Sequence, residues 1–109
     1  MVPKDLVAAS AVPLILGILR RGESYGYAIL ARVRELSGGQ LEWKEGMLYP
    51  VLHRMEEQKL VTTALRDSDE GRRRKYYRIT PAGRRCLEEH QGQWRLMNEV
   101  LQLAWGGSQ

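Results

Sequence analysis

The stretch WKEGMLYPVLHRMEEQKL, residues 43–60, decides the fold of this chain. Its apolar residues recur at three- and four-residue steps, which predicts an amphipathic helix with one side buried in a core. Pro50 removes a backbone donor and crowds the preceding turn, so we expect the helix to begin near Gly46 or to be distorted there. The apolar row consists of Met47, Leu48, Val51, Leu52, Met55 and, beyond them, Leu60.

The other side of this helix is polar. Its side chains end in hydrogen-bonding or cationic groups, which suit a polar, anionic surface, although an ordinary solvent-exposed helix has a similar pattern. The polar side chains are Lys44, Tyr49, His53, Arg54 and Glu57.

Length and charge limit the class of protein. A chain of 109 residues predicts one small domain, and small domains often gain stability by oligomerising. The net charge of +4 fits a polyanionic partner. A single cysteine, Cys86, excludes an internal disulfide framework. No long apolar run and no secretory pattern occur in the sequence, so we expect a soluble, cytoplasmic protein without a membrane partner.

Two further helices precede the central one. The first apolar segment spans residues 4–12, and Pro13 predicts a break before residues 14–21 continue as a helix. In this interpretation Leu6, Val7, Ala9 and Val12 form an apolar arm outside the core. Residues 23–26 are predicted to form a turn, and residues 27–36 a second helix.

The periodicity changes after residue 60. Residues 61–66 and 76–80 alternate between apolar and polar side chains, which predicts two antiparallel strands. Tyr77 shares a strand face with Ile79 and is therefore expected in the core, and Tyr25 in the core or a turn. The connection at residues 67–75 is a polar hairpin tip that ends in four cations, Arg72, Arg73, Arg74 and Lys75.

The final segment predicts one long helix over residues 81–105, with Thr80 as its N-cap and Pro81 in its first position. A helix of this length extends about 36 Å, which is more than so small a core can cover. The uncovered side is therefore expected to pack on a second copy of the chain. The predicted dimer-contact residues are Leu87, Trp94, Met97 and Leu101.

The order of three helices, a hairpin and a long helix predicts a fold class. It is mainly α with a two-stranded β-wing (α+β), a winged helix-turn-helix followed by a dimerisation helix. The expected organisation is a DNA-binding unit with its N-terminal arm at residues 1–80 and a C-terminal dimerisation helix at residues 81–109.

Three blocks resemble a known family. YGYAIL at 25–30, GMLYPVLHRMEEQKLV at 46–61 and RRRKYYRITPAGR at 72–84 are similar to the signature blocks of PadR-type bacterial transcription regulators. The chain resembles their short subclass, which has a single C-terminal helix. The resemblance implies a homodimer that represses nearby genes and is released by an effector. The chain differs from the family pattern at Met47, where a small hydroxyl residue is common, and at Lys59, where glycine usually ends the recognition helix.

Double-stranded DNA is the expected partner, read as a palindromic operator. Lys44 and Tyr49 are the favoured groove contacts, with His53 and Arg54 as further candidates, and Arg72 to Lys75 are expected to contact phosphates. A solvated helix face and a solvated charge run are the alternative interpretations. A winged helix that binds protein is the alternative function.

A flat, hydrophobic effector is the second expected partner. The short subclass that this chain resembles has a tryptophan at the position of Trp94, where two copies flank a cleft. The expected effector-binding residues are Trp94, Leu6, Ala9, Gln91, Met97 and Asn98. Packing in the dimer contact is the other role weighed for Trp94.

Catalysis and cofactor binding are not expected. The sequence has no metalloprotease motif, nucleophile elbow or phosphate loop, which argues against an enzyme. Cys86, Glu89 and His90 share a helix face and are weak candidates for metal ligands. A packed cysteine beside a histidine at the dimer contact is the favoured interpretation, and a metal-responsive regulator is the alternative.

Overall fold

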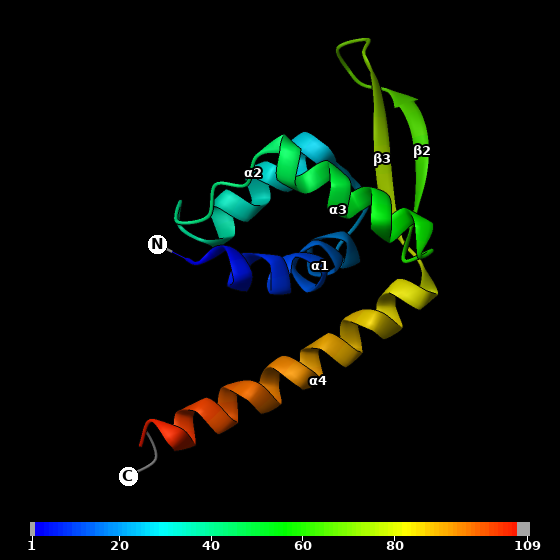
Figure 1. Cartoon of the computed structure of the whole chain (residues 1–109). Helices are drawn as coiled ribbons and strands as arrows, with labels where there is room; N and C mark the ends of the chain where they lie inside the picture. The colour runs from blue at the N-terminus through cyan, green and yellow to red at the C-terminus, as the bar shows by residue number, and fades with distance from the viewer. Residues whose placement is uncertain (1, 107–109) are drawn as a thin grey trace.

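The computed structural model describes residues 2–106. Residue 1 of the expected DNA-binding unit and residues 107–109 of the expected dimerisation helix lie outside the described residues. The elements are α1 (Lys4–Arg20), β1 (Ser24–Tyr25), α2 (Gly26–Leu36), α3 (Glu45–Glu57), β2 (Val61–Asp67), β3 (Arg73–Ile79) and α4 (Pro81–Ala104). Helices α1 to α3 form a cluster beside the β2–β3 hairpin, which projects from it as a wing, and α4 runs away beneath them (Figure 1). None of the described helices is long and apolar enough to cross a membrane.

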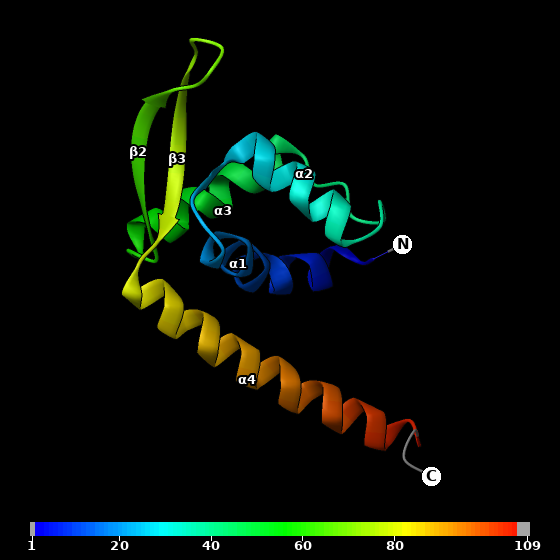
Figure 2. The same ribbon diagram turned by 180° about the vertical axis from the view of Figure 1, so that it is seen from behind.

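The core lies where the apolar faces of the first three helices meet one face of the sheet. The predicted apolar row of α3 is confirmed, with Leu48, Leu52 and Met55 fully buried and Val51 nearly so. These side chains pack with residues from α1, α2 and the wing strands. The view from behind shows the three helices grouped beside the wing strands (Figure 2). The other main core residues are Ile15, Leu16, Leu19, Ile29, Val33, Val61, Tyr77 and Ile79.

Helix α1 is continuous, so the predicted break at Pro13 is wrong. Proline removes one hydrogen bond of the helix, at a cost of about 3 kcal/mol. Residues on both sides of it pack on the same core, Val7 and Ala11 before and Ile15 after, and this burial holds the two halves in line. The expected arm is thus only partly outside the core, since Val7 and Val12 pack against it while Leu6 and Ala9 are exposed.

The sheet has three strands, where the sequence predicted two. Ser24 and Tyr25, which were expected in a turn, form β1 and pair with Tyr77 and Tyr76 of β3. The strand order is β1-β3-β2, and all pairs are antiparallel. A strand of two residues is too short to show an alternating pattern, so its partner strand defines it.

The wing strands are longer than predicted. Strand β2 continues to Asp67 and β3 begins at Arg73, and these two residues pair with each other in the sheet. The loop between the strands therefore contains residues 68–72 alone, with Gly71 in a left-handed conformation. The prediction that all four wing cations lie in the tip is wrong, because Arg73, Arg74 and Lys75 belong to β3.

Helix α3 begins at Glu45, one residue before the position expected from Pro50. Lys59 ends the turn after the helix with a φ of 63°, the only positive φ of a non-glycine residue in the described chain. This is the left-handed region that favours glycine. The lysine therefore adopts the conformation expected of the glycine that the family pattern has at this position.

The start of α4 is fixed tightly to the wing. Thr80 is the N-cap as predicted, since its hydroxyl oxygen accepts a hydrogen bond from the Gly83 amide at 2.9 Å, and Pro81 stands in the first turn. The Thr80 amide and hydroxyl both donate to the Leu60 carbonyl at 3.0 Å. Gly83 lies against this same carbonyl, where no side chain would fit.

Beyond its first turns α4 leaves the core. Gly83 and Leu87 are its buried residues, whereas residues 92–105 are all exposed. The ribbon of α4 runs away from the other helices toward its C-terminal end (Figure 1). The radius of gyration is 15.6 Å, compared with about 13 Å for a compact domain of this length. The exposed large apolar side chains of this half are Trp94, Leu96, Met97, Val100, Leu101, Leu103 and Trp105.

Candidate nucleic-acid interface

The polar face of α3 is exposed, as the sequence predicted. Tyr49, His53 and Arg54 lie on this face, and Lys44 caps the helix start with an extended backbone and an exposed side chain. His53 Nε2 lies 3.6 Å from a carboxylate oxygen of Glu57 on the same face. The face therefore has three cationic or titratable groups and one phenol around a helix that can enter a groove.

Tyr49 is held by an unusual neighbour. Its phenol ring lies so close to Gly26, the first residue of α2, that a Cβ at Gly26 would overlap the hydroxyl group. The ring is nevertheless 42% exposed, so its edge remains available to a partner. Gly26 of α2 thus restricts the direction of a side chain on the exposed face of α3.

Replacing Gly26 with alanine is expected to push the Tyr49 ring outward. Since the ring is at the surface and can rotate, the loss of folding free energy should be only about 1 kcal/mol, whereas DNA affinity should fall if Tyr49 contacts bases. The measurement is a double-mutant cycle of Gly26→Ala and Tyr49→Ala on DNA affinity. If the losses of DNA affinity in the two single variants simply add in the double variant, Gly26 does not act through Tyr49.

The four wing cations lie in different surroundings because strand residues alternate between two faces. Arg73 and Lys75 share the face of the buried Tyr77, while Arg74 lies on the opposite, outer face with Tyr76 and Arg78. Arg72 belongs to the loop and has an exposed side chain. The sequence cluster is therefore spread around the wing.

Three of these cations have acidic neighbours. Arg73 lies 3.6 Å from Asp67 and Arg74 lies 3.5 Å from Glu70. Lys75 donates to Glu56 of α3 at 3.2 Å, and Thr63 donates to the other oxygen of that carboxylate at 3.0 Å. The hydrogen bond from Lys75 is the main reason that the pKa of Glu56 lies below its usual value. The contacts to Glu56 join the wing to α3, and the three ion pairs together leave less positive charge on the wing than the sequence indicates.

The outer face of the wing has a second ionic cluster, which the sequence analysis missed. Glu23, just before β1, accepts hydrogen bonds from Arg66 of β2 at 2.6 Å and from Arg78 of β3 at 3.0 Å. These hydrogen bonds, first that from Arg66, lower the pKa of Glu23. The alternation of β2 and β3 puts Arg66, Arg74 and Arg78 on one face, but the position of Glu23 depends on β1, which had no sequence signal.

A small hollow beside the start of α3 was also missed. It has a volume of about 150 Å³ and lies between α2 and the segment before α3, with Tyr27, Arg34 and Lys44 among its lining residues. Trp43 lines it too and is the one buried side chain among residues 2–106 whose polar atom, Nε1, has no hydrogen-bond partner. Tyr27 is 72% exposed, which makes it a further candidate contact next to Lys44.

Only three of the six expected effector-binding residues line the same depression. Trp94, Met97 and Ala9 line a shallow depression of about 260 Å³ between α4 and α1, together with His90 and Gln93. Leu6, Gln91 and Asn98 do not line it. Leu87, expected in the dimer contact, is 5% exposed and packs in the protomer's own core, because the first turns of α4 lie on α1 and β3. Leu87 is therefore not available for a contact with a second copy.

The weak metal candidates lie on the first half of α4. Cys86 packs against the core, and its partial burial is the main reason that the pKa of its thiol is raised. A raised pKa disfavours the thiolate that a metal would need. Within residues 2–106, no three His, Cys, Asp or Glu side chains are grouped closely enough to hold a metal ion.

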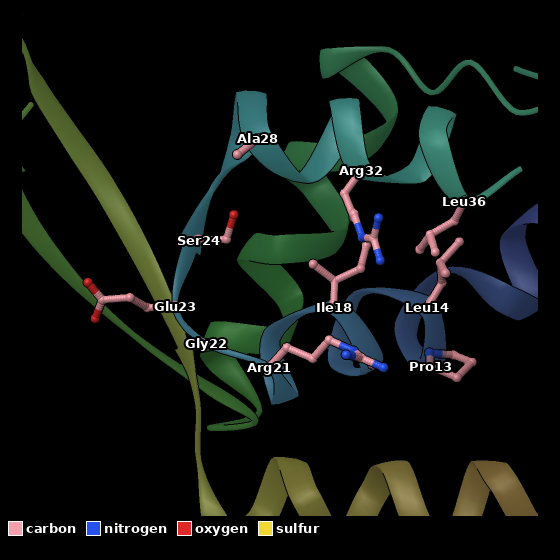
Figure 3. Close-up of a pocket in the computed structure, with 11 residues that line it drawn as sticks. Pro13, Leu14, Ile18, Arg21, Gly22, Glu23, Ser24, Ala28, Arg32 and Leu36 are labelled. Atoms are coloured by element: carbon pink, nitrogen blue, oxygen red, sulfur yellow. The ribbon is translucent and has the colours of Figure 1, made fainter. Parts of the chain in front are cut away.

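A larger groove separates α1 from α2 (Figure 3). Its volume is about 500 Å³, and its apolar walls include Leu14, Ile18 and Leu36. Arg21 and Arg32 stand at its edge, whereas Glu23 extends away from it toward the wing strands (Figure 3). This groove was not anticipated from the sequence.

Fold and site together define a winged helix-turn-helix protein of the kind that binds DNA. The family model of the transcriptional regulator PadR-like family matches residues 15–89, and the chain belongs to this family. It is a DNA-binding transcriptional regulator, as its resemblance indicated, and not an enzyme.

Two solved structures and one sequence relative agree with this assignment. A transcriptional regulator from Clostridium thermocellum is 29% identical, with a TM-score of 0.85 over 93% of this chain and 95% of that one. A PadR family regulator from Clostridium difficile is 35% identical, with a TM-score of 0.77 over 88% and 98%. The transcriptional regulator YqjI of Escherichia coli is 33% identical over 87% of this chain, which spans 44% of YqjI.

Proposed function

We propose that this regulator is a homodimeric repressor that binds a palindromic operator and is released by a small hydrophobic effector. The observation that carries the proposal is the exposed apolar half of α4, which extends from a unit whose α3 and wing present polar and cationic groups. In this proposal, residues 1–80 bind DNA and residues 81–109 join two copies.

The dimer is supported by the amount of apolar surface on α4. Six large apolar side chains lie exposed on its C-terminal half and a seventh, Trp105, directly follows it. A monomeric soluble protein rarely exposes so large an apolar patch. A second copy packed there would bury them, with Trp94, Met97 and Leu101 in the contact. Two recognition helices would then be held at a fixed separation, and half-sites one turn of DNA apart lie about 34 Å from each other.

DNA recognition is assigned to three groups of residues. Lys44 and Tyr49 are the proposed base contacts, with His53 and Arg54 as further contacts on the same face. Arg72 is the wing cation most open to a phosphate, because Arg73, Arg74 and Lys75 have acidic neighbours within the protomer. Charge-assisted contacts to phosphate would exchange these intramolecular pairs for intermolecular ones.

The test is an electrophoretic mobility shift assay with a palindromic DNA fragment from the gene's own promoter. Analytical ultracentrifugation of the free protein gives its oligomeric state. We expect a dimer whose specific complex weakens steeply as salt is raised, because phosphate contacts release counterions. A monomer at working concentration would exclude the dimeric mechanism. Failure to bind any promoter fragment at low salt would favour a winged helix that binds protein.

The effector is proposed to bind at the depression beside Trp94. A second copy would cover this open depression and add its own Trp94, which gives a flat apolar ligand two faces to stack on. A ligand at the dimer contact can change the separation of the two recognition helices and thereby release DNA.

Fluorescence quenching by a flat cationic dye tests this site. The chain has three tryptophans, of which Trp43 is buried and Trp105 is 70% exposed, so the assay uses a Trp105→Phe background. We expect saturable quenching that is lost in Trp94→Ala and that is accompanied by release of the operator fragment. Saturable quenching that persists without Trp94 would place the ligand elsewhere.

A further inference from the structure

A group of positive charges lies at the base of the wing, apart from the wing tip and from the exposed face of α3. A hollow of about 520 Å³ there is bordered by five arginines and one glutamate, which together have the same net charge, +4, as the whole chain. The hollow lies where the end of α1, the outer face of the sheet and the start of α4 meet. Its charged residues are Arg20, Arg21, Glu23, Arg66, Arg78 and Arg84.

The single carboxylate in this hollow does not neutralise it. Glu23 is already bound by Arg66 and Arg78, so it has little attraction left for the other guanidinium groups. Within the part of the chain that the structure describes, Arg20 and Arg84 form no salt bridge, and both are exposed. The cations around the hollow repel one another and attract an external anion.

The hollow continues into a row of arginines along the wing. The strand register puts Arg74 opposite Arg66, and Arg78 follows Arg74 by four residues on the same outer face. Four residues of antiparallel strand span about 14 Å. Duplex DNA has one phosphate charge for about every 1.7 Å of its axis, so a row of this length can contact several phosphates.

Two of these arginines lie over aromatic rings. The Arg74 guanidinium lies 4.3 Å from the centre of the Tyr25 ring, and that of Arg66 lies 5.1 Å from the centre of the Tyr76 ring. The two rings contact each other edge to face at 5.4 Å. Stacking on rings restricts the guanidinium groups without neutralising them, which reduces the entropy lost when they bind an anion.

We propose that this outer wing face, from Arg74 to Arg20 and Arg84, is a second phosphate-contacting surface, and that it binds the duplex flanking the operator. The proposal rests on the proposed function. A duplex is favoured over a small phosphate ligand because the arginines form an open row and not an enclosed pocket. The flanking DNA bends toward the wing base to reach the hollow, and bending of this kind costs about 1–6 kcal/mol, which phosphate contacts offset.

The test compares two duplexes, a core palindrome and the same palindrome extended by one helical turn on each side. For the unmodified protein, we expect the extension to tighten binding about tenfold and to steepen the salt dependence by about 3–4 units, since each dimer gains four phosphate contacts from Arg20 and Arg84. In the Arg20→Gln/Arg84→Gln variant, most of the affinity gained from the extension should be lost, while affinity for the core changes less than about twofold.

Glu23→Gln is the matched variant with the opposite sign. It removes the carboxylate that binds Arg66 and Arg78, so the affinity gained by extending the duplex should be larger than for the unmodified protein. The melting temperature of the variant shows whether its fold is intact. The proposal would be overturned if the extension gave the unmodified protein no additional affinity. It would also be overturned if the Arg20→Gln/Arg84→Gln variant lost affinity equally for the core and extended duplexes. In both cases the proposed binding to the operator itself would still stand. Failure of the unmodified protein to bind the core would instead reject the proposed function.

Discussion

Replacement of Gly83 with alanine is expected to lower the free energy of unfolding by about 3 kcal/mol, the upper part of the range for overpacked sites. A Cβ at this position would overlap the Leu60 carbonyl oxygen and lie 2.8 Å from Cγ1 of Ile79. The carbonyl cannot move aside easily, because it accepts the hydrogen bonds of Thr80 that fix the start of α4. The alanine therefore has to displace backbone and not the end of a flexible side chain.

The measurement is thermal unfolding of both forms at the same protein concentration, because the proposed dimerisation would make the melting temperature depend on concentration. For a domain of this size, 3 kcal/mol corresponds to a decrease of about 12 °C or more. Gly46→Ala is the control, since this glycine is also helical but has open space around its Cβ position. A melting temperature for Gly83→Ala equal to that of the control would show that the junction is not tightly packed.

Neutralising the wing cations is expected to have the largest effect on DNA binding. The variant replaces Arg72, Arg73, Arg74 and Lys75 with glutamine, which removes eight charges from the proposed dimer. Each phosphate contact contributes about 0.9 to the slope of log affinity against log salt, so the slope should fall by about 2–7 units. We expect at least a 100-fold loss of operator affinity at physiological salt, an order-of-magnitude value based on the same counterion release.

Phosphate contacts are independent of sequence, which supplies the internal control. The ratio of affinities for the operator and for a scrambled fragment should change little, because the base contacts from α3 remain. An unchanged salt slope would mean that these cations serve only their intramolecular pairs with Asp67, Glu70 and Glu56.

Sequence periodicity predicted the main elements well, because each depends on local interactions. The apolar row from Met47 to Met55 identified α3, and the alternation around Tyr77 and Ile79 identified the wing. The Thr80–Pro81 start of α4 was predicted to the residue, since capping involves only the neighbouring turn. The family signature blocks added the assignment to DNA-binding regulators.

The candidate interface was predicted in part. The exposed face of α3 follows from helical geometry, so Tyr49, His53 and Arg54 were identified correctly as surface residues. Their roles in base recognition remain a proposal. The arginine hollow at the wing base was not predicted, because its members come from α1, the sheet and α4, and no local pattern brings together residues so distant in sequence.

The sequence by itself determined the order and type of the elements, from three helices through the hairpin to the long last helix, because side-chain spacing within one segment is sufficient for that. Tertiary structure alone decided that α1 passes through Pro13, that Ser24 and Tyr25 become a strand, and that the wing cations divide between two faces. Each of these depends on packing or hydrogen bonding with a segment far along the chain. Such energies outweigh local preferences, and no local pattern can reveal them.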